Sequence, residues 1–191
     1  MDYSKVKKAV PILLFLFVFS LVIDNSFKLI SVAIANDLNI SVTTVSWQAT
    51  LAGLVIGIGA VVYASLSDAV SIRTLFIYGV FLIITGSIIG YIFQHYFPMV
   101  LIGRIIQTAG LAAAETLYVI YVAKYLSTED QKTYLGLSTS SYSLSLVIGT
   151  LSGGFIATYL HWTNMFLIAL IVVFTLPFLF KYLPKEKKGI K

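Results

Sequence analysis

The segment that decides the fold is "LIGRIIQTAGLAAAETLYVIYVAKYL", Leu101 to Leu126, in which an arginine, a glutamine and a glutamate lie among apolar and small residues. About 20 such residues form a helix long enough to cross the roughly 30 Å hydrocarbon core of a bilayer. Arg104, Gln107 and Glu115 would then lie inside the membrane, where charged groups are costly and normally face a bundle interior or a wet cavity. The segment therefore predicts a membrane helix with a polar stripe.

The rest of the chain has the same character. Of its 191 residues, 59% are hydrophobic and 11% are charged, whereas a soluble domain is about half apolar and a quarter charged. Because backbone groups in hydrocarbon must be paired within their own segment, the apolar stretches are expected to be helices. We predict an all-α, polytopic membrane protein, one six-helix transmembrane domain over 1–191, with spans at about 11–34, 47–66, 75–93, 98–121, 135–160 and 164–183.

Several functional classes are disfavoured. The chain has no cysteine and two histidines, His95 and His161, which are far apart in the sequence. We therefore expect no disulfide, no metal site and no cofactor. No serine–histidine or phosphate-binding constellation is visible, so we expect no enzyme and no catalytic residue. The net charge of +5 comes from residues that flank apolar segments, which indicates membrane topology and not nucleic-acid binding.

The basic residues also predict the orientation. Eleven of the 13 flank alternate ends of the spans: Lys5, Lys7, Lys8, Arg73, Lys124, Lys132, Lys181, Lys185, Lys187, Lys188 and Lys191. The positive-inside rule places these segments in the cytoplasm. With an even number of spans, both termini are then cytoplasmic.

Four charged residues lie within predicted spans: Asp24, Lys28, Arg104 and Glu115. Asp24 and Lys28 are four positions apart, so they share a helix face and are placed to pair, either as a functional site or as a pair that only orients the helix. Arg104 and Glu115 are eleven positions apart, which puts them on one stripe but about 16 Å apart along the axis. They either pair with neighbouring helices or line a water-accessible path.

Small residues form a second pattern. Ser145, Gly149 and Gly153 recur every four residues, with Gly154 beside them, and a similar set, Gly53, Gly57 and Ala64, lies in the second span. Such faces allow membrane helices to approach closely. For the second span in particular we expect close packing.

These features resemble the N-terminal half of a major facilitator superfamily transporter, specifically a drug:proton antiporter. The loop "ASLSDAVSIRTL" is similar to the family's G-x-L-x-D-x-x-G-R-K-x-x-L through Leu66, Asp68, Arg73 and Leu75, with Ala64 and Ser71 replacing its glycines. The segment "RIIQTAGLAA" is similar to R-x-x-Q-G-x-G-x-A through Arg104, Gln107 and Gly110, with Thr108 replacing a glycine.

Two further motifs extend the resemblance. The segment "SLVIGTLSGG" is similar to the antiporter motif G-x-x-x-G-P-x-x-G-G through Gly149, Gly153 and Gly154; Thr150 replaces the proline. The segment "DNSFKLISVA" resembles the acidic first-span motif of drug-efflux members through Asp24, with Lys28 where an asparagine is common. In detail the chain is most similar to tetracycline efflux proteins of Gram-positive bacteria, although Glu115 departs from their pattern.

This resemblance implies proton-coupled efflux of a drug-like small molecule, tetracycline as its magnesium chelate, across the bacterial cytoplasmic membrane. Arg104 would serve proton coupling together with Gln107, while Asp24, next to Lys28, would exchange protons or meet the cationic part of the substrate, with Glu115 second. By the same resemblance, Asp68 and Arg73 would form a cytoplasmic gate. Gly149, Gly153 and Gly154 would let the fifth span bend and pack.

A complete transporter of this family has a second six-helix half, and substrate binds between the two. We expect this chain to be a truncated half. The alternatives are a half-transporter that forms a homo-oligomer, and a non-transporting membrane scaffold or accessory protein. The sequence fixes neither the substrate nor the choice between twelve and fourteen spans.

Overall fold

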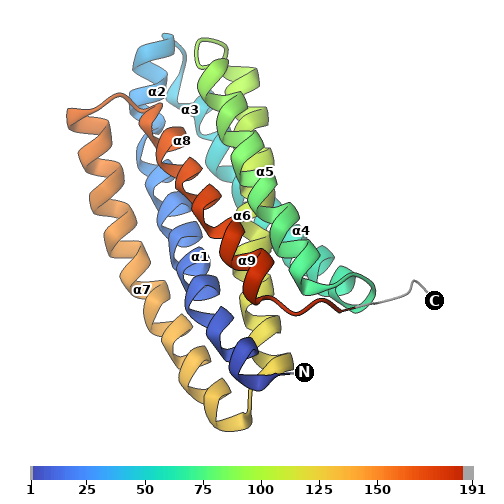
Figure 1. Cartoon of the computed structure of the whole chain (residues 1–191). Coiled ribbons are helices and arrows are strands. Elements are labelled where there is room, and N and C mark those ends of the chain that lie inside the picture. The colour runs from blue at the N-terminus through green and yellow to red at the C-terminus, as the bar shows by residue number, and fades with distance from the viewer. Residues whose placement is uncertain (1, 187–191) are drawn as a thin grey trace.

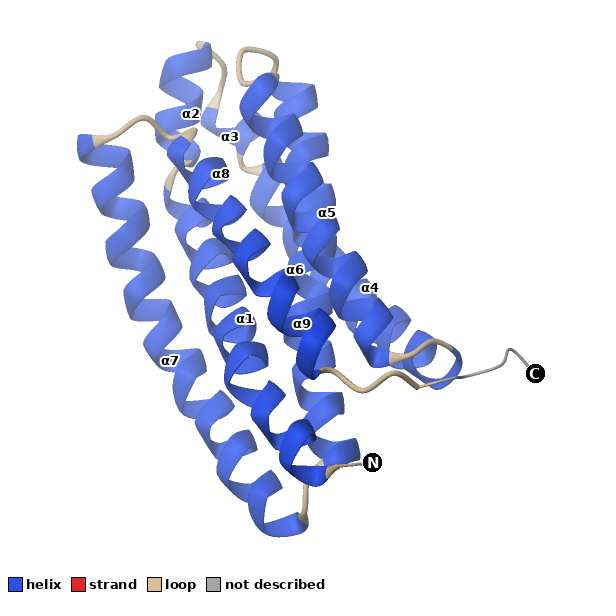
Figure 2. Ribbon diagram, in the orientation of Figure 1, coloured by secondary structure: helices blue, strands red, loops and turns tan. Residues whose placement is uncertain are grey.

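The computed structural model describes residues 2–186 and is helical throughout that range apart from short connections (Figure 2). Lys187, Lys188 and Lys191 of the predicted basic tail lie outside the described residues. Six stretches are long and apolar enough to cross a membrane, which confirms an all-α protein with six transmembrane helices. The elements are α1 (Tyr3–Leu29), α2 (Ser31–Leu38), α3 (Val42–Val45), α4 (Trp47–Ala69), α5 (Ile72–Ile92), α6 (Phe97–Tyr125), α7 (Thr128–Tyr159), α8 (Asn164–Ala169), the 3₁₀ helix η1 (Leu170–Thr175) and α9 (Leu176–Tyr182).

The helices form one elongated bundle (Figure 1). Helix α6 packs extensively on α5 and α4, helix α1 packs on α7 and α6, and the α8–η1–α9 segment lies across α5 and α1. The start of α1, the α4–α5 and α6–α7 connections and the end of α9 lie at one end of the bundle (Figure 1). Every basic residue predicted to be cytoplasmic, within the described range, therefore belongs to that end.

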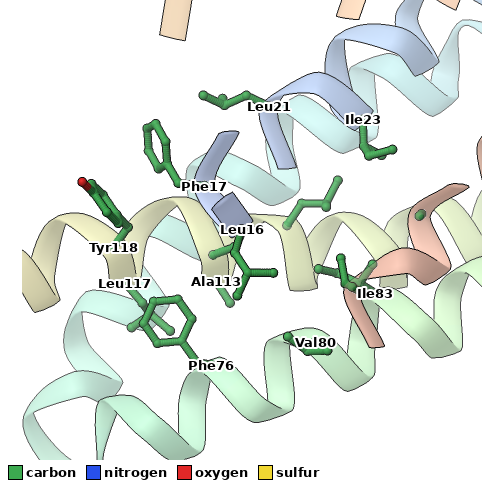
Figure 3. Packing of buried hydrophobic residues seen from close by; sticks show 14 of the residues in the cluster. Leu16, Phe17, Leu21, Ile23, Phe76, Val80, Ile83, Ala113, Leu117 and Tyr118 are labelled. Carbon is green, nitrogen blue, oxygen red and sulfur yellow. The ribbon is translucent and has the colours of Figure 1, made fainter. Parts of the chain in front are cut away.

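The core joins α1, α5 and α6. Buried apolar side chains from all three helices interdigitate (Figure 3), among them Leu16, Phe17, Phe76, Val80, Ile83, Leu117 and Tyr118. Helices α5 and α6 approach so closely at Gly86 and Gly103 that a methyl group on Gly103 would lie 2.7 Å from the carbonyl oxygen of Gly86. Only glycine fits at such a backbone contact, which holds α6 in place for the polar residues that follow.

The first span differs from its prediction at both ends. Helix α1 begins at Tyr3 and continues through Pro11, the predicted start of the span. The side chain of Asp2 caps it by accepting a hydrogen bond from the Ser4 N–H at 3.0 Å. Instead of running to Ile34, the helix ends at Leu29 with a break at Ile30, and α2 follows directly.

The expected polar connection "NDLNISVTTVS" is also partly helical. Helix α2 extends to Leu38 and ends at Asn39, whose φ of 54° is the left-handed conformation that often terminates a helix. Helix α3 is then capped by the Ser41 hydroxyl, which accepts from the Thr44 N–H at 3.1 Å. Polar capping residues therefore form short helices where hydropathy suggested a loop.

The sixth span is not a continuous α-helix. Its middle, η1, is a 3₁₀ helix just before Pro177, which lies in the first turn of α9. Proline has no N–H to donate to the preceding turn, and the freed backbone adopts the tighter 3₁₀ pattern.

Candidate functional site

The interior of the bundle, toward the end opposite the basic residues, holds a buried polar network formed by Asp24 of α1, Gln48 of α4, and Arg104, Gln107 and Thr108 of α6. Each of these residues is at most 7% exposed. Polar side chains at this depth normally face one another, because lipid offers them no partners. The network is the strongest candidate for a functional site in the described chain.

Arg104 is the hub of the network. Its guanidinium donates to Oδ1 of Asp24 at 2.7 Å and to Oε1 of Gln48 at 3.2 Å. It also donates to Oε1 of Gln107 at 3.2 Å and to Oγ1 of Thr108 at 2.6 Å. The Phe27 ring covers one face of the guanidinium, with Cζ 4.3 Å from the ring centroid. A buried arginine with these partners is held as a fixed positive charge.

Of the two alternatives for Arg104, the structure shows the one in which it pairs with a neighbouring helix. Asp24 accepts from Arg104 on one carboxylate oxygen, while its Oδ2 lies 3.3 Å from Nζ of Lys28. The two cations differ in environment: the side chain of Arg104 is 1% exposed and that of Lys28 is 51% exposed. Oδ1 of Asp24 is thus held by a buried arginine, whereas Oδ2 faces a lysine that is accessible from outside the bundle.

Gln48 connects the network to the break in the first span. Its Nε2 donates to the carbonyl of Phe27 at 2.7 Å and to Oγ of Ser31 at 3.2 Å. On the other side, Nε2 of Gln107 donates to Oγ of Ser87 in α5 at 3.0 Å. The network therefore spans α1, α2, α4, α5 and α6.

Sequence reasoning did not single out Gln48, Ser31 or Ser87. The available signal was weak: each is an uncharged polar residue within or beside an apolar span, and such residues usually face the bundle interior. Thr108 was noted only as a replacement for a glycine, whereas in the structure it is an acceptor for Arg104.

Glu115, on α6, is near the network but has no hydrogen bond to it in the described chain. It is half-buried, and its Oε1 is fully buried without a hydrogen-bond partner in the described part of the chain. Among the described residues, none of the ion pairs includes it. A buried carboxylate oxygen without a partner is unfavourable unless it takes up a proton or a cation.

The glycines of α7 separate into two groups. A methyl group on Gly149 would lie 2.6 Å from Cβ of Asn25, and one on Gly153 would lie 2.7 Å from the carbonyl oxygen of Ser26. Ser26 also donates to the carbonyl of Gly149 at 2.9 Å. A methyl group on Gly154 would meet nothing within 4 Å. Gly149 and Gly153 therefore form the α1–α7 contact, and Gly154 faces away from it.

The expectation of close packing by the glycines of the second span is wrong within the described chain. A methyl group on Gly53 or Gly57 would meet no atom within 4 Å. These residues lie on the outer face of α4, beside the exposed side chains of Leu54, Ile58 and Val61. Small residues at i and i+4 are compatible with either a packed or an outward face, so spacing alone did not distinguish the two.

Asp68 and Arg73 are separate from the network and from each other. Asp68 is exposed at the end of α4, and no ion pair joins it to Arg73 among the described residues. Arg73 instead places its guanidinium over the Phe180 ring, with Cζ 5.5 Å from the centroid. Both lie at the end of the bundle that carries the basic residues.

Comparison with known proteins fits this architecture. The family model of the Major Facilitator Superfamily matches residues 12–191. The chain is 28% identical over 159 residues to the uncharacterized MFS-type transporter YwoD of Bacillus subtilis (strain 168), covering 82% of this chain and 35% of that protein. It is 27% identical over 153 residues to the uncharacterized MFS-type transporter YbcL of the same organism, covering 76% of this chain and 39% of that protein. The chain thus spans a little over a third of the length of these curated relatives.

Proposed function

The chain belongs to the Major Facilitator Superfamily, a family of membrane transporters and not of enzymes, and on this premise we propose that it serves proton-coupled export of a drug-like small molecule. The observation that carries the proposal is the ion pair between Asp24 and Arg104, at 2.7 Å, buried between membrane-spanning helices. Ionisable groups at this depth mark proton and substrate pathways. We place the chain in the bacterial cytoplasmic membrane, with both termini in the cytoplasm.

The geometry suggests how Asp24 would act. Arg104 remains bound to Oδ1, whereas the ammonium of Lys28 at Oδ2 is half-exposed and 3.3 Å away. A proton or the cationic part of a substrate would replace Lys28 at Oδ2. Proton and substrate would then compete for the same carboxylate oxygen. Such competition is the basis of antiport, because binding of one ligand releases the other.

Glu115 is the second proposed carboxylate. Its buried Oε1 lacks a hydrogen-bond partner in the described chain. A bound proton or a cationic group of the substrate would compensate for that missing partner. Gln107 would hold Arg104 in position through its hydrogen bond at 3.2 Å. Asp68 and Arg73 would form a gate on the cytoplasmic side, and Gly149, Gly153 and Gly154 would let α7 rock against α1.

We further propose a second six-helix half, or a second copy of this chain, as the partner. In the most apolar part of α4 only 11% of residues are buried, and in α7 22%, against 56% in α6. The outer faces of α4 and α7 are thus free to pack on another half, with the substrate bound between the two. For the substrate we propose tetracycline as its magnesium chelate, on the resemblance of the motifs alone.

The test is tetracycline accumulation in inverted membrane vesicles that contain this chain, with magnesium present and with or without a proton gradient. We expect gradient-dependent uptake that Arg104→Ala reduces to the level of vesicles lacking the chain. The variants Asp24→Asn and Glu115→Gln then show which carboxylate couples transport to protons. Substitution of the coupling residue shifts the pH profile of uptake, and substitution of the other does not. Gradient-dependent uptake that survives Arg104→Ala would remove the ion pair from the mechanism. No uptake by a chain shown to be inserted would contradict transport by this chain alone.

A further inference from the structure

A second gathering of charge lies at the end of the bundle, away from the polar network. A cavity of about 440 Å³ opens between the start of α1, the start of α5 and the end of α9. Four cationic side chains line it, with Asp2 as the one acid among its lining residues: Lys5, Arg73, Lys181 and Lys185. Basic residues from three segments that are distant in the sequence therefore surround one hollow.

These four cations have no acidic partner in the described chain. None of them takes part in an ion pair among the described residues, and Asp2 instead accepts from the Ser4 N–H. Aromatic rings hold two of the cations: Arg73 lies over Phe180, and Nζ of Lys181 lies 5.2 Å from the Tyr182 centroid. Gathering like charges is unfavourable unless an anion lies between them. An anion with several oxygens, such as a phosphate, would offset the repulsion among the four cations.

A second, mainly apolar groove adjoins the cavity at Tyr182. It has a volume of about 370 Å³ and is lined by Lys8, Pro11, Ile12, Phe178 and Tyr182, so that Tyr182 borders both spaces. Helices α1 and α9 are in contact and run side by side (Figure 1). From Lys5 to Ile12, α1 advances roughly 10 Å at 1.5 Å per residue, while Phe178 lies one turn back from Tyr182 on α9. Both helices change from charged to apolar side chains in the same direction.

We propose that this cavity and groove form a binding site for an anionic phospholipid such as phosphatidylglycerol. The phosphate would lie among the four cations and one acyl chain would lie along Ile12 and Phe178. Basic pockets between membrane helices suit anionic headgroups, and the apolar groove favours a lipid over free phosphate, which would use only the cavity. The proposal does not depend on the transport function.

The test compares two double variants that remove the same charge from the same end of the bundle. Lys5→Gln with Lys181→Gln removes two cations from the cavity. Lys124→Gln with Lys132→Gln is the control, because neither residue lines the cavity. The full chain is placed in nanodiscs of equal phosphatidylglycerol and phosphatidylcholine, and native mass spectrometry gives the ratio of the two lipids that stay bound. Circular dichroism checks that each variant keeps its helix content. If the double cavity variant has lost helix content, the single Lys181→Gln variant is tested in its place.

We expect phosphatidylglycerol to be enriched on the unmodified chain and the enrichment to fall roughly fivefold for each cavity lysine removed. The control variant should change it by less than about twofold, because Lys132 is exposed and does not line the cavity, and Lys124 is already paired with Glu186 at 3.3 Å. Equal losses in both variants would overturn the site in favour of diffuse attraction to the end of the bundle. A lack of preference for phosphatidylglycerol would overturn it outright. Displacement of the lipid by inorganic phosphate would show a free-anion site and overturn the lipid assignment.

Discussion

At the scale of single residues, Arg104 explains why the chain places a charge in a membrane helix. Its planar guanidinium donates four hydrogen bonds, to side chains on α1, α4 and α6. An ammonium group on a flexible chain has three donors and cannot match this fork-shaped arrangement. The identity of the residue as arginine, and not only its charge, therefore determines how three helices are held together.

Arg104→Lys should lower the free energy of unfolding by about 2–3 kcal/mol, because at least two hydrogen bonds are lost and buried acceptors remain unpaired. Thermal unfolding in detergent, followed by circular dichroism, measures the loss. Arg73→Lys is the matched control, since Arg73 is half-buried and contacts the Phe180 ring; it should cost less than about 1 kcal/mol. Equal losses for the two variants would show that the network does not depend on the guanidinium.

Gln48→Leu tests the link between the network and the first span. The variant removes the donor to the Phe27 carbonyl and the acceptor for Nε of Arg104. Leaving such buried groups unpaired costs about 1–3 kcal/mol each, so we expect a lower unfolding midpoint. In the control Gln94→Leu, the lost hydrogen bond is to the exposed Tyr91 carbonyl at 2.9 Å, and the midpoint should hardly change. An unchanged midpoint for Gln48→Leu would mean that water replaces its hydrogen bonds.

At the scale of elements, hydropathy predicted where the six spans lie but not how each is built. Span length and apolar content are local properties, and a bilayer requires helices wherever they occur. Beside the break at Ile30, the Phe27 carbonyl accepts a hydrogen bond from Gln48 of another helix, a contact that hydropathy cannot predict. The same limit applies to the site: Arg104 and Asp24 were visible as charges, while Ser87 became part of the network only through packing of α5 on α6.

The glycines of α7 allow a paired test of the α1–α7 contact. Gly149→Ala places a methyl group against Asn25 and the Val22 carbonyl, and overpacking of this kind costs about 1–3 kcal/mol. Gly154→Ala adds the same methyl group where nothing lies within 4 Å, so it should be neutral or stabilise the helix by up to about 1 kcal/mol. Unfolding midpoints of the two variants in detergent give the comparison. A loss in Gly154→Ala as large as in Gly149→Ala would place that face of α7 against a partner.

At the scale of the whole molecule, the burial of side chains differs from helix to helix around the bundle, whereas the basic residues are distributed unevenly along its length. Helices α1 and α6 are central and carry the buried ion pair, whereas α4 and α7 expose broad apolar faces, which include Leu54, Val61, Leu151 and Phe155. Along the length of the bundle, the basic residues of the described range other than Lys28 and Arg104 collect at one end. Ties such as Lys7 Nζ to Asp130 Oδ1, at 3.1 Å, join α1 to α7 there. The bundle is thus joined by an ion pair between α1 and α7 at its basic end and is apolar on two sides.

The distribution of basic residues predicts the orientation of this bundle in the membrane, and the absence of cysteine in the sequence makes the prediction simple to test. Lys132→Cys puts a thiol at the exposed start of α7, at the basic end, and His95→Cys puts one in the exposed α5–α6 connection at the opposite end. Because positively charged segments stay on the cytoplasmic side, a membrane-impermeant maleimide should label His95→Cys in intact cells. It should label Lys132→Cys only after the cells are broken. The unmodified chain, which has no thiol, gives the background. Labelling of Lys132→Cys in intact cells, with His95→Cys protected, would invert the topology and place the proposed gate on the outer side of the membrane.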